Sequence, residues 1–482
     1  MNSLSPRDAA VYWLSRRSRT DLFLLYCFEE TNQSTELLRA GIVKRVSGIP
    51  DLLIHVLDTP ANIAYPIWAP CEFIDEQFAD HGRTAATWAN LEAAVGDLLA
   101  ASLCANHRPW RLHVFREVSE APGFAGDRPA LVAVLQLSHA LADGRRAADL
   151  ARALFTGDAD RSDDAGRADD AKARPTPPVR MPDVVARWSA AALALPTIPI
   201  GMARTVIRGV RAYRAQQELA ELTAAAAIPA PAPTVAPNLL NGGGAAPGGH
   251  AVRMLVRDRD RLLLPDRTVT VVAATAISLA LERYCAHRGV PAGELRAQVP
   301  LALAVNPVER NSYRDLSVDL AVGEPDPRRR AARIADDLTL RRERASHPLQ
   351  SAQDAATAAV PAPLLHRDAI RAPIDVLPER VSGHTVISSV NRGAADLFFG
   401  GRVRFTSGFP ALGAVMHLTH GVHGLGDSVT VSVHADTAIF PDLDAYVALL
   451  DTALDEVVND EGSGRIESGR SLRERRIGDL NP

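Results

Sequence analysis

The chain has 482 residues and is 47% hydrophobic, which is long and apolar enough to bury a sizeable core in two or more domains. Lys and Arg number 53 against 57 Asp and Glu, giving a formal net charge of -4 and a pI near 6.4. Without a basic excess the chain lacks the field that gathers nucleic acid, so nucleic-acid binding is not expected.

The four cysteines are widely spaced and form no CxxC pair; they are Cys27, Cys71, Cys104 and Cys285. This usage argues against a disulfide framework or a zinc knuckle and favours a reducing, cytoplasmic setting. The opening residues MNSLSPRDAAVYWL lack the basic and apolar regions of a secretory signal, so export is not expected.

Up to about residue 155, short apolar runs alternate with segments of helical spacing. The apolar runs predict strands at 21–28, 51–57 and 130–137. Apolar side chains recur at helical intervals over 88–103 and 144–154 and predict two helices. This alternation indicates a first α/β domain, expected over residues 1–155.

A linker region is expected over residues 156–249. It begins with the charged, Pro-ended stretch 156–178 and closes with the Pro-rich and then Gly-rich stretch 228–249, both typical of flexible spacers. Between them, residues 184–222 interleave apolar side chains with arginines at helical spacing. Two interpretations stay open for this segment: a crossover helix packed between domains, or a basic amphipathic face resting on a membrane surface.

The longest uncharged apolar segment, 188–203, is shorter than the roughly 20 residues that span a bilayer. It is also interrupted by Pro196 and Pro199. An integral membrane protein is therefore not expected.

A second periodic half covers residues 250–458 and predicts another α/β domain. Its expected elements are strands at 252–256, 295–305, 384–390, 402–407 and 428–435, with helices at 269–287 and 443–458. The remaining residues, 459–482, are charged and contain Gly and Ser, so we expect a frayed tail there.

One histidine follows the apolar run 130–137, in the stretch LQLSHALADGRRAADL. A neutral imidazole accepts a proton from a hydroxyl near neutral pH, so His139 qualifies by type as a general base. At the carboxyl end of a strand it would lie where open α/β sheets hold ligands. Asp143 would orient the loop by pairing with an arginine, and Gly144 would supply an unusual φ for the turn. The plainer alternative is that Asp143 caps a helix beside a half-buried histidine.

Short motifs follow one another along the whole chain. They are Leu-Ser-Pro-Arg-Asp-Ala at 4–9, Arg-Pro-Trp at 108–110, Ser-His-Ala-Leu-Ala-Asp-Gly at 138–144, Leu-Asn-Gly at 240–242, Val-Pro at 299–300, and Asp436 before Pro441-Asp442. In this order they resemble the bacterial wax ester synthase/diacylglycerol acyltransferase family, of the chloramphenicol acetyltransferase-like superfamily. The resemblance spans about residues 4–455, and the histidine motif is its most specific part.

The resemblance implies two similar α/β domains joined by a long crossover, with a tunnel between them for acyl-CoA and an acceptor alcohol. His139 would correspond to the general base of the family and Asp143 to its structural aspartate, followed by Gly144. The base would deprotonate the acceptor hydroxyl for direct attack on the thioester. No metal or cofactor is implied, because acyl-CoA is a substrate.

The sequence departs from the family pattern within the motifs. Ser138 stands where the family has the first histidine of a pair, and Thr270-Val271 stand where it has Asn-Asp. The family loop Ser-Asn-Val-Pro-Gly-Pro, which resembles an acyl-site loop, reads Ser-Ser-Val-Asn-Arg-Gly over 388–393. Its candidate acyl- or acceptor-site residues are Ser388, Ser389 and Asn391.

A further departure concerns the partner of the motif aspartate. Ala304 aligns with the arginine that would hold Asp143 in the family. Asp143 would then lack its expected anchor, unless Arg296 or Arg310 substitutes.

Two other patterns are not expected to be sites. His417, His420 and His423 recur at spacing three and His434 follows, but no Cys or acidic residue completes a metal-ligand spacing. The stretch NGGGAAPGG at 241–249 lacks the Lys-Ser/Thr of a phosphate-binding loop and is interpreted as a spacer.

Three hypotheses for function remain. The first is an acyl-CoA-dependent O-acyltransferase that forms triacylglycerol or wax ester from diacylglycerol or a long-chain alcohol, with His139 as base. The second is a catalytically degraded relative that binds lipid or acyl-CoA without turnover. The third is an acyltransferase with a different acceptor, since condensation-type enzymes share the HxxxDG arrangement. Contact with a membrane or lipid-droplet surface would be peripheral, through residues 184–214.

Overall fold

The computed structural model describes residues 2–124, 128–156, 182–242, 248–304, 308–374, 376–413 and 415–459. The expected spacer at 156–178 and tail at 459–482 lie outside these residues, apart from residues 156 and 459. The Gly-rich part of the second spacer, 243–247, also lies outside them.

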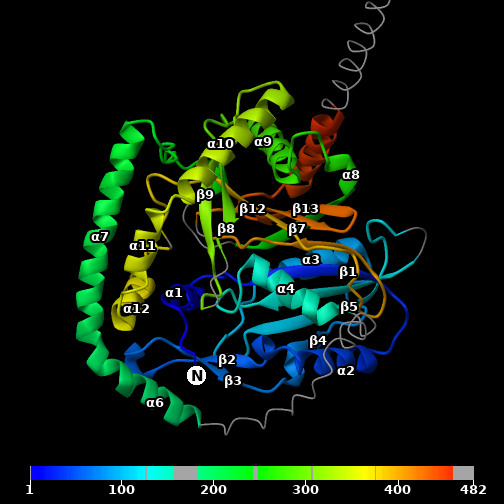
Figure 1. The fold of residues 1–482 in the computed structure, drawn as a ribbon. Coiled ribbons are helices and arrows are strands. Elements are labelled where there is room, and N and C mark those ends of the chain that lie inside the picture. The colour runs from blue at the N-terminus through cyan, green and yellow to red at the C-terminus, as the bar shows by residue number, and fades with distance from the viewer. Residues whose placement is uncertain are drawn as a thin grey trace, which may run out of the picture.

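The first half of the chain builds most of a five-stranded sheet, in the order β11-β1-β6-β5-β4 (Figure 1). Its strands are β1 (Leu22–Glu29), β4 (Phe78–Asp80), β5 (Trp110–Val118) and β6 (Ala130–Leu137), with β11 (Val403–Gly408) from the second half. All eight positions of β6 are buried, as expected for a central strand covered on both faces. A separate hairpin pairs β2 (Ile54–Leu57) with β3 (Ile67–Pro70).

Both faces of this sheet are covered because side chains of β1 alternate between them. Leu24, Tyr26 and Phe28 enter one core with α1, α2 and α4, whereas Leu25 and Cys27 enter another with α3. These helices are α1 (Pro6–Ser15), α2 (Thr35–Val46), α3 (Trp88–Leu99) and α4 (Gly144–Phe155). Each begins after a capping side chain that accepts a backbone N–H: Ser5, Ser34, Thr87 and Asp143.

The second half builds a six-stranded sheet in the order β7-β13-β12-β10-β8-β9. Its strands are β7 (His250–Asp258), β8 (Arg296–Ala302), β9 (Tyr313–Asp319), β10 (Thr385–Asn391), β12 (Leu418–Leu425) and β13 (Ser428–Asp436). One large core packs this sheet against α9, α10 and a helix over 443–459. The helices of this half include α8 (Arg259–Leu262), α9 (Val269–His287) and α10 (Pro327–Ala345).

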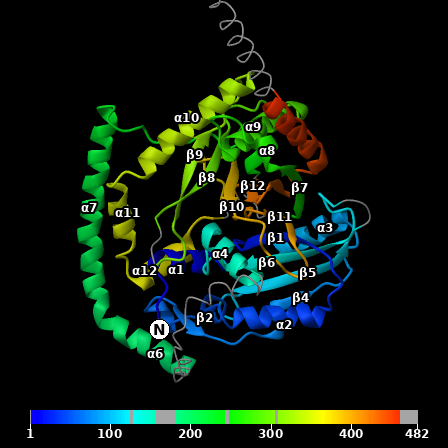
Figure 2. The same cartoon turned by 45° about the vertical axis from the view of Figure 1, so that its right-hand side comes forward.

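The described part of the linker region forms a long helical crossover. It consists of α6 (Asp183–Ala194), a short turn at Leu195–Thr197 and α7 (Ile198–Ala224). Figures 1 and 2 show α7 along the outside of the molecule, beside α11 (Gln350–Thr357) and α12 (Ala362–Arg371). The segment is a helical crossover, but the expectation that it is packed between domains is wrong: it lies along the outside, and only one face of it packs on the body of the protein.

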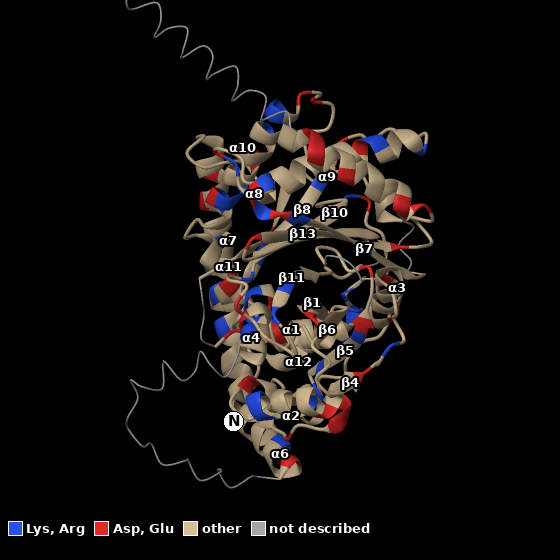
Figure 3. Ribbon diagram, turned by 90° about the vertical axis from the view of Figure 1, so that its right-hand side faces the viewer, with Lys and Arg blue, Asp and Glu red and all other residues tan. Residues whose placement is uncertain are grey.

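The two halves are joined by a close approach of two backbones and by hydrogen bonds from an arginine side chain. At Gly96 in α3, an added Cβ would lie 2.4 Å from the carbonyl oxygen of His250, so a side chain there would push α3 away from β7. Arg152 of α4 donates to the carbonyl oxygens of Arg392 and Ala394, at 3.0 Å and 2.6 Å. Acidic and basic residues are interspersed over both halves, as Figure 3 shows.

Candidate active site

A tight turn at the end of β6 presents His139. The backbone N–H of Ser138 donates to the carbonyl oxygen of Pro109 at 2.7 Å, and that of Leu141 donates to Ser138 at 2.8 Å. Both neighbours of His139 are buried, whereas its own side chain is partly exposed. The turn thus holds the imidazole at the carboxyl end of the central strand.

Asp143 follows the turn and caps α4. One carboxylate oxygen accepts the N–H of Arg146 at 2.9 Å, and the other accepts the N–H of Ser312 at 3.0 Å. Its own N–H donates to the carbonyl oxygen of Arg310 at 3.1 Å. The capping interpretation is therefore confirmed, and the same aspartate ties α4 to a loop of the second half.

The expected arginine partner of Asp143 is wrong. Among the described residues no arginine side chain is bonded to its carboxylate; the two oxygens accept the backbone N–H groups of Arg146 and Ser312 instead. Arg310 instead binds Asp51 at 2.9 Å, and Arg296 lies 3.4 Å from Asp337.

The expected φ of Gly144 is also wrong, because it is not among the residues with positive φ. Gly144 begins the α-helix, and an added Cβ would meet nothing closer than Val390, at 3.8 Å. A small side chain would be accommodated at this position.

Asn311 connects His139 to the other half of the molecule. Its Oδ1 lies 2.7 Å from Nδ1 of His139, and its Nδ2 donates to the carbonyl oxygen of His139 at 2.8 Å. The same Nδ2 donates to Asp8 at 3.0 Å. Because both groups facing Nδ2 are pure acceptors, Oδ1 must face the ring, so Nδ1 carries the proton and Nε2 keeps a lone pair.

Asp8 is the fixed point of this network and is 1% exposed. Its carboxylate accepts the backbone N–H groups of Arg310 and Asn311, both at 3.0 Å, and the Ser5 hydroxyl at 2.7 Å. Asp8 and Ser5 belong to the Leu-Ser-Pro motif near the N-terminus. That motif therefore positions the loop that in turn positions His139.

Strand β9 places an aromatic ring and a carboxyl group beside the imidazole. The ring of Tyr313 lies 5.8 Å from that of His139, and the Arg7 guanidinium lies over the Tyr313 ring, 5.7 Å from its centroid. Asp315 is solvent-exposed yet closely surrounded, and loss of hydration raises the pKa of its carboxyl against the opposing effects of His139 and Arg7. The site therefore holds a negative group close enough to influence the ring.

The sequence-predicted loop on β10 lies next to the histidine motif at one point, the contact between Gly144 and Val390. The hydroxyl of Ser389 is 2.7 Å from that of Thr270, and Asn391 accepts the N–H of Gly393 at 3.0 Å. Ser388 is partly buried on the same strand. The structure thus brings the strand to the motif but gives its polar side chains local partners.

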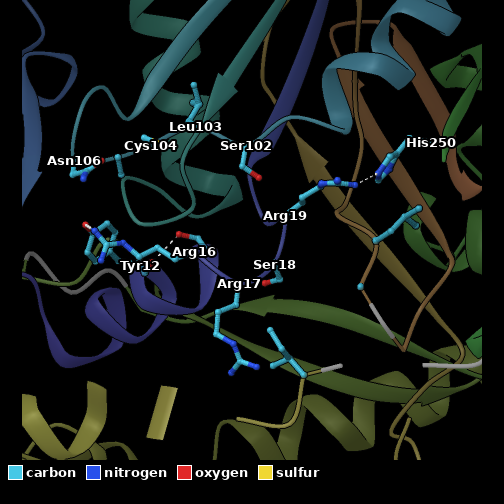
Figure 4. A pocket seen from close by; sticks show the side chains of 15 residues that line it. Tyr12, Arg16, Arg17, Ser18, Arg19, Ser102, Leu103, Cys104, Asn106 and His250 are labelled. Carbon is cyan, nitrogen blue, oxygen red and sulfur yellow. Dashed lines mark hydrogen bonds between the residues drawn. The ribbon is translucent and has the colours of Figure 1, made fainter. Parts of the chain in front are cut away.

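A cavity of about 470 Å³ lies at the carboxyl end of α1, between the two halves (Figure 4). Arg16, Arg17 and Arg19 line it together with His250. Arg16 pairs with Asp58 at 2.5 Å, while Arg19 is bonded to His250 at 3.1 Å. This basic lining suits an anionic group. His139 is not among the residues that line this cavity.

The histidines on and near β12 serve the core. His417 pairs with Asp436 at 2.8 Å, and His420 is bonded to Tyr446 at 2.7 Å. Burial lowers the pKa of both His420 and His434 to about 3, so they are neutral. No group of three or more potential metal ligands occurs in the described part of the chain.

Sequence reasoning missed Asn311. Its loop is unpatterned, and the contact with His139 joins residues 172 positions apart. The Leu-Ser-Pro motif was recognised, but nothing in it indicates that Asp8 reaches Asn311. Its position shortly after the Val-Pro strand is the one feature of the sequence that could have indicated it.

Two α/β halves that meet at a histidine on a strand end define a class, the two-domain chloramphenicol acetyltransferase-like fold. The solved wax ester synthase/diacylglycerol acyltransferase from Marinobacter aquaeolei VT8 has a TM-score of 0.60 at 15% identity, covering 95% of this chain and 100% of that one. The family model described as the wax ester synthase/diacylglycerol acyltransferase catalytic domain matches residues 4–241. Residues 4–241 therefore carry the catalytic domain of that acyltransferase family.

Condensation domains share the fold. A starter condensation domain of rhizomide synthetase in complex with C8-CoA and Leu-SNAC has a TM-score of 0.53 at 12% identity, covering 96% of this chain and 94% of that one. The first condensation domain of the CDA synthetase has a TM-score of 0.51 at 13% identity, covering 95% and 96%. No curated protein matches the sequence.

Proposed function

We propose that the protein is an acyl-CoA-dependent O-acyltransferase that acylates a lipid alcohol, diacylglycerol or a long-chain alcohol, to give triacylglycerol or wax ester. One observation carries the proposal: Asn311 holds His139 in the tautomer whose Nε2 can accept a proton. Family membership supplies the acyl-transfer chemistry, and this geometry supplies the base.

The reaction requires one proton to move twice. Nε2 of His139 takes the proton of the acceptor hydroxyl while the oxygen attacks the thioester carbonyl carbon. The tetrahedral intermediate collapses, the C–S bond breaks, and the new ester C–O bond remains. The imidazolium then returns the proton to the CoA thiolate, so no covalent enzyme intermediate and no cofactor is needed.

The neighbours of His139 support this role. The imidazolium formed during the reaction keeps its Nδ1–H bond to Asn311, and the nearby carboxyl of Asp315 favours the positive charge. Asp143 fixes the turn by backbone contacts and does not reach the reacting atoms. The arginine-lined cavity supports an anionic co-substrate, since the phosphates of acyl-CoA complement Arg19.

The same proposal includes the cellular setting. A reducing, cytoplasmic setting is supported by the wide spacing of the four cysteines, which form no CxxC pair. A diacylglycerol or long-chain alcohol resides in lipid rather than in water, so the partners include a membrane or lipid-droplet surface.

The test is CoA release from a long-chain acyl-CoA, measured with and without diacylglycerol or a fatty alcohol, in wild type and His139→Ala. We expect acceptor-dependent turnover that falls by at least about 100-fold in the variant, the usual contribution of a general base. His287→Ala, at the exposed end of α9, is the matched control and should keep wild-type activity.

Retained turnover in His139→Ala would contradict the role of His139 as the general base. Saturable acyl-CoA binding without turnover on any acceptor would instead establish a degraded relative that binds lipid. Turnover restricted to an amine acceptor would establish the different-acceptor hypothesis.

A further inference from the structure

The crossover carries an unusual concentration of exposed apolar side chains. Of the 21 large apolar side chains exposed in the described residues, 11 lie between residues 184 and 213. They are Val184, Val185, Trp188, Leu193, Leu195, Ile200, Met202, Val206, Ile207, Val210 and Tyr213. Scattered exposed apolar residues are ordinary, whereas a contiguous set of this kind marks a binding surface. We call the outward side of α6 and α7 the arm face.

The opposite side of the crossover is held to the body of the protein. Thr205 donates to the carbonyl oxygen of Ala359 at 2.8 Å, and Arg208 donates to that of Ala355 at 3.1 Å. Arg187 donates to the carbonyl oxygen of Asp58 at 2.7 Å. The arm face is therefore displayed on a fixed helix that lies against α11.

Between residues 184 and 217 of the crossover, the charged side chains all have one sign. Residues 184–217 contain five arginines and no Asp, Glu or Lys. Arg204, Arg211 and Arg214 are exposed among the apolar side chains of the arm face. The arm face thus combines apolar side chains with positive charge, which is the composition of helices that bind an anionic lipid surface.

The crossover fits a position along the bilayer surface better than one across the bilayer. Residues 183–224 and α9 are each long and apolar enough to cross a membrane by length and composition; α9 is mostly buried in the core. The crossover is almost wholly exposed, yet its inner side is bonded to α11. A helix held along the body can lie in the interface, where its arginines reach headgroups.

A second copy of the chain fits the arm face less well. A symmetric dimer would place the same patch on both sides of the contact, with arginines facing arginines. The preceding stretch 157–181 has six Asp against five Lys and Arg and almost no large apolar side chains, so it complements neither the charge nor the apolar surface of the arm face.

We propose that the arm face docks on an anionic phospholipid membrane, with its apolar side chains among the acyl chains and its three exposed arginines on headgroup phosphates. The inference deepens the proposed function by naming the surface that meets the lipid acceptor, and it rests on that function only for the acceptor's lipid nature. Acyl-CoA reaches the enzyme from water, whereas the acceptor comes from this surface.

Vesicle flotation tests the proposal with the intact protein, using phosphatidylcholine vesicles with and without phosphatidylglycerol. We expect binding to the anionic vesicles that exceeds binding to neutral ones by about tenfold and weakens with added salt. Val206→Glu with Ile207→Glu should lower binding at least about tenfold, and Gln at 204, 211 and 214 should remove the preference for anionic lipid.

Leu37→Glu is the matched control, since Leu37 is 65% exposed and Val206 is 66% exposed, on opposite parts of the molecule. It should bind vesicles as wild type does. Binding that survives both sets of substitutions would overturn the proposal. So would a wild-type dimer that Val206→Glu with Ile207→Glu converts to monomer without any change in flotation.

Flotation is independent of turnover. If the protein binds vesicles as expected but wild type transfers no acyl group, the membrane-docking proposal is supported and the proposed function is rejected. Acyl transfer to a short, water-soluble alcohol should be unchanged in the arm-face variants, because α7 is bonded to residues 355 and 359 and not to the residues that hold His139.

Discussion

Asn311 is the residue at which the two halves of the chain act on one ring. It accepts from His139 and donates to Asp8, so a buried carboxylate fixes the amide and the amide fixes the imidazole. Without the amide oxygen the ring would lose both its tautomer preference and its orientation. Asn311 therefore acts through His139 and touches no substrate.

Asn311→Leu keeps the size of the side chain and removes its hydrogen bonds. We expect kcat for acyl transfer to fall roughly 10- to 100-fold with little change in KM for acyl-CoA, since base orientation is lost and binding is not. Steady-state kinetics on acyl-CoA measure both constants. An unchanged kcat in a variant that still unfolds cooperatively would show that Asn311 is structural only.

The site was partly predictable at this scale. His139 is predicted as the base from its residue type, its place after an apolar run and the resemblance of its motif to the family. The structure places its ring beside Asn311, and its role as base stays a prediction. The partner of Asp143 was predicted wrongly, because a sequence reveals charged side chains but not the backbone N–H groups that meet in space. The backbone N–H groups of Ser312 and Arg146 donate to the Asp143 carboxylate, where an arginine side chain was expected.

Among the elements, α3 and β7 form a direct contact between the halves. Glu92 of α3 is 6% exposed, accepts the N–H of Met254 at 3.0 Å and lies 3.6 Å from Arg253. Burial raises the pKa of Glu92 to about 7, although Arg253 and that N–H act in the opposite direction. This contact therefore contains a carboxyl that the fold prefers protonated.

Glu92→Gln should stabilise the protein at pH 8 and change little at pH 5. With a folded pKa near 7 and an unfolded one near 4.5, the folded state holds the extra proton, so stability falls as pH rises through this window. The penalty removed at pH 8 is at most about 3 kcal/mol. Urea unfolding at both pH values measures it, and lower stability at pH 8 would show that the pair with Arg253 dominates.

Elements buried on a regular period were predicted well. The run 130–137 coincides with β6 and the run 269–287 with α9, because their apolar patterns are long and end at caps or turns. Strand β9 was not predicted, since its sequence YRDLSVD alternates polar and apolar residues with charges facing the site. The partner of β11 was also beyond prediction, because periodicity shows that a strand has two faces and not which strand lies beside it.

For the molecule as a whole, β11 makes the first sheet depend on the second half. Strand β11 pairs with β1 in antiparallel fashion. The side chain of Arg392, which directly follows β10, donates to the Thr406 hydroxyl and to the Ser407 carbonyl oxygen of β11 and so ties this strand to the second half. Phe405 packs in the core beneath α3. The catalytic-domain family match ends at residue 241, so it includes neither Arg392 nor strand β11.

A fragment of residues 1–241 should therefore not fold alone. Without β11 it exposes the edge of β1, and without the loop of Asn311 it leaves Asp8 buried beside empty space. Size exclusion and circular dichroism should show an aggregated or non-cooperative species, and co-expression with residues 248–459 should restore a 1:1 complex. Cooperative unfolding of the isolated fragment would contradict this expectation.

The position of β11 also has a consequence for biosynthesis. Residues 30–402 leave the ribosome between β1 and its edge partner, which takes roughly 20 to 75 s at ordinary rates of translation. Throughout that time the hydrogen-bonding edge of β1 is open to other nascent chains. Slower initiation or more chaperone should therefore raise the soluble yield, because each reduces the number of such edges that meet.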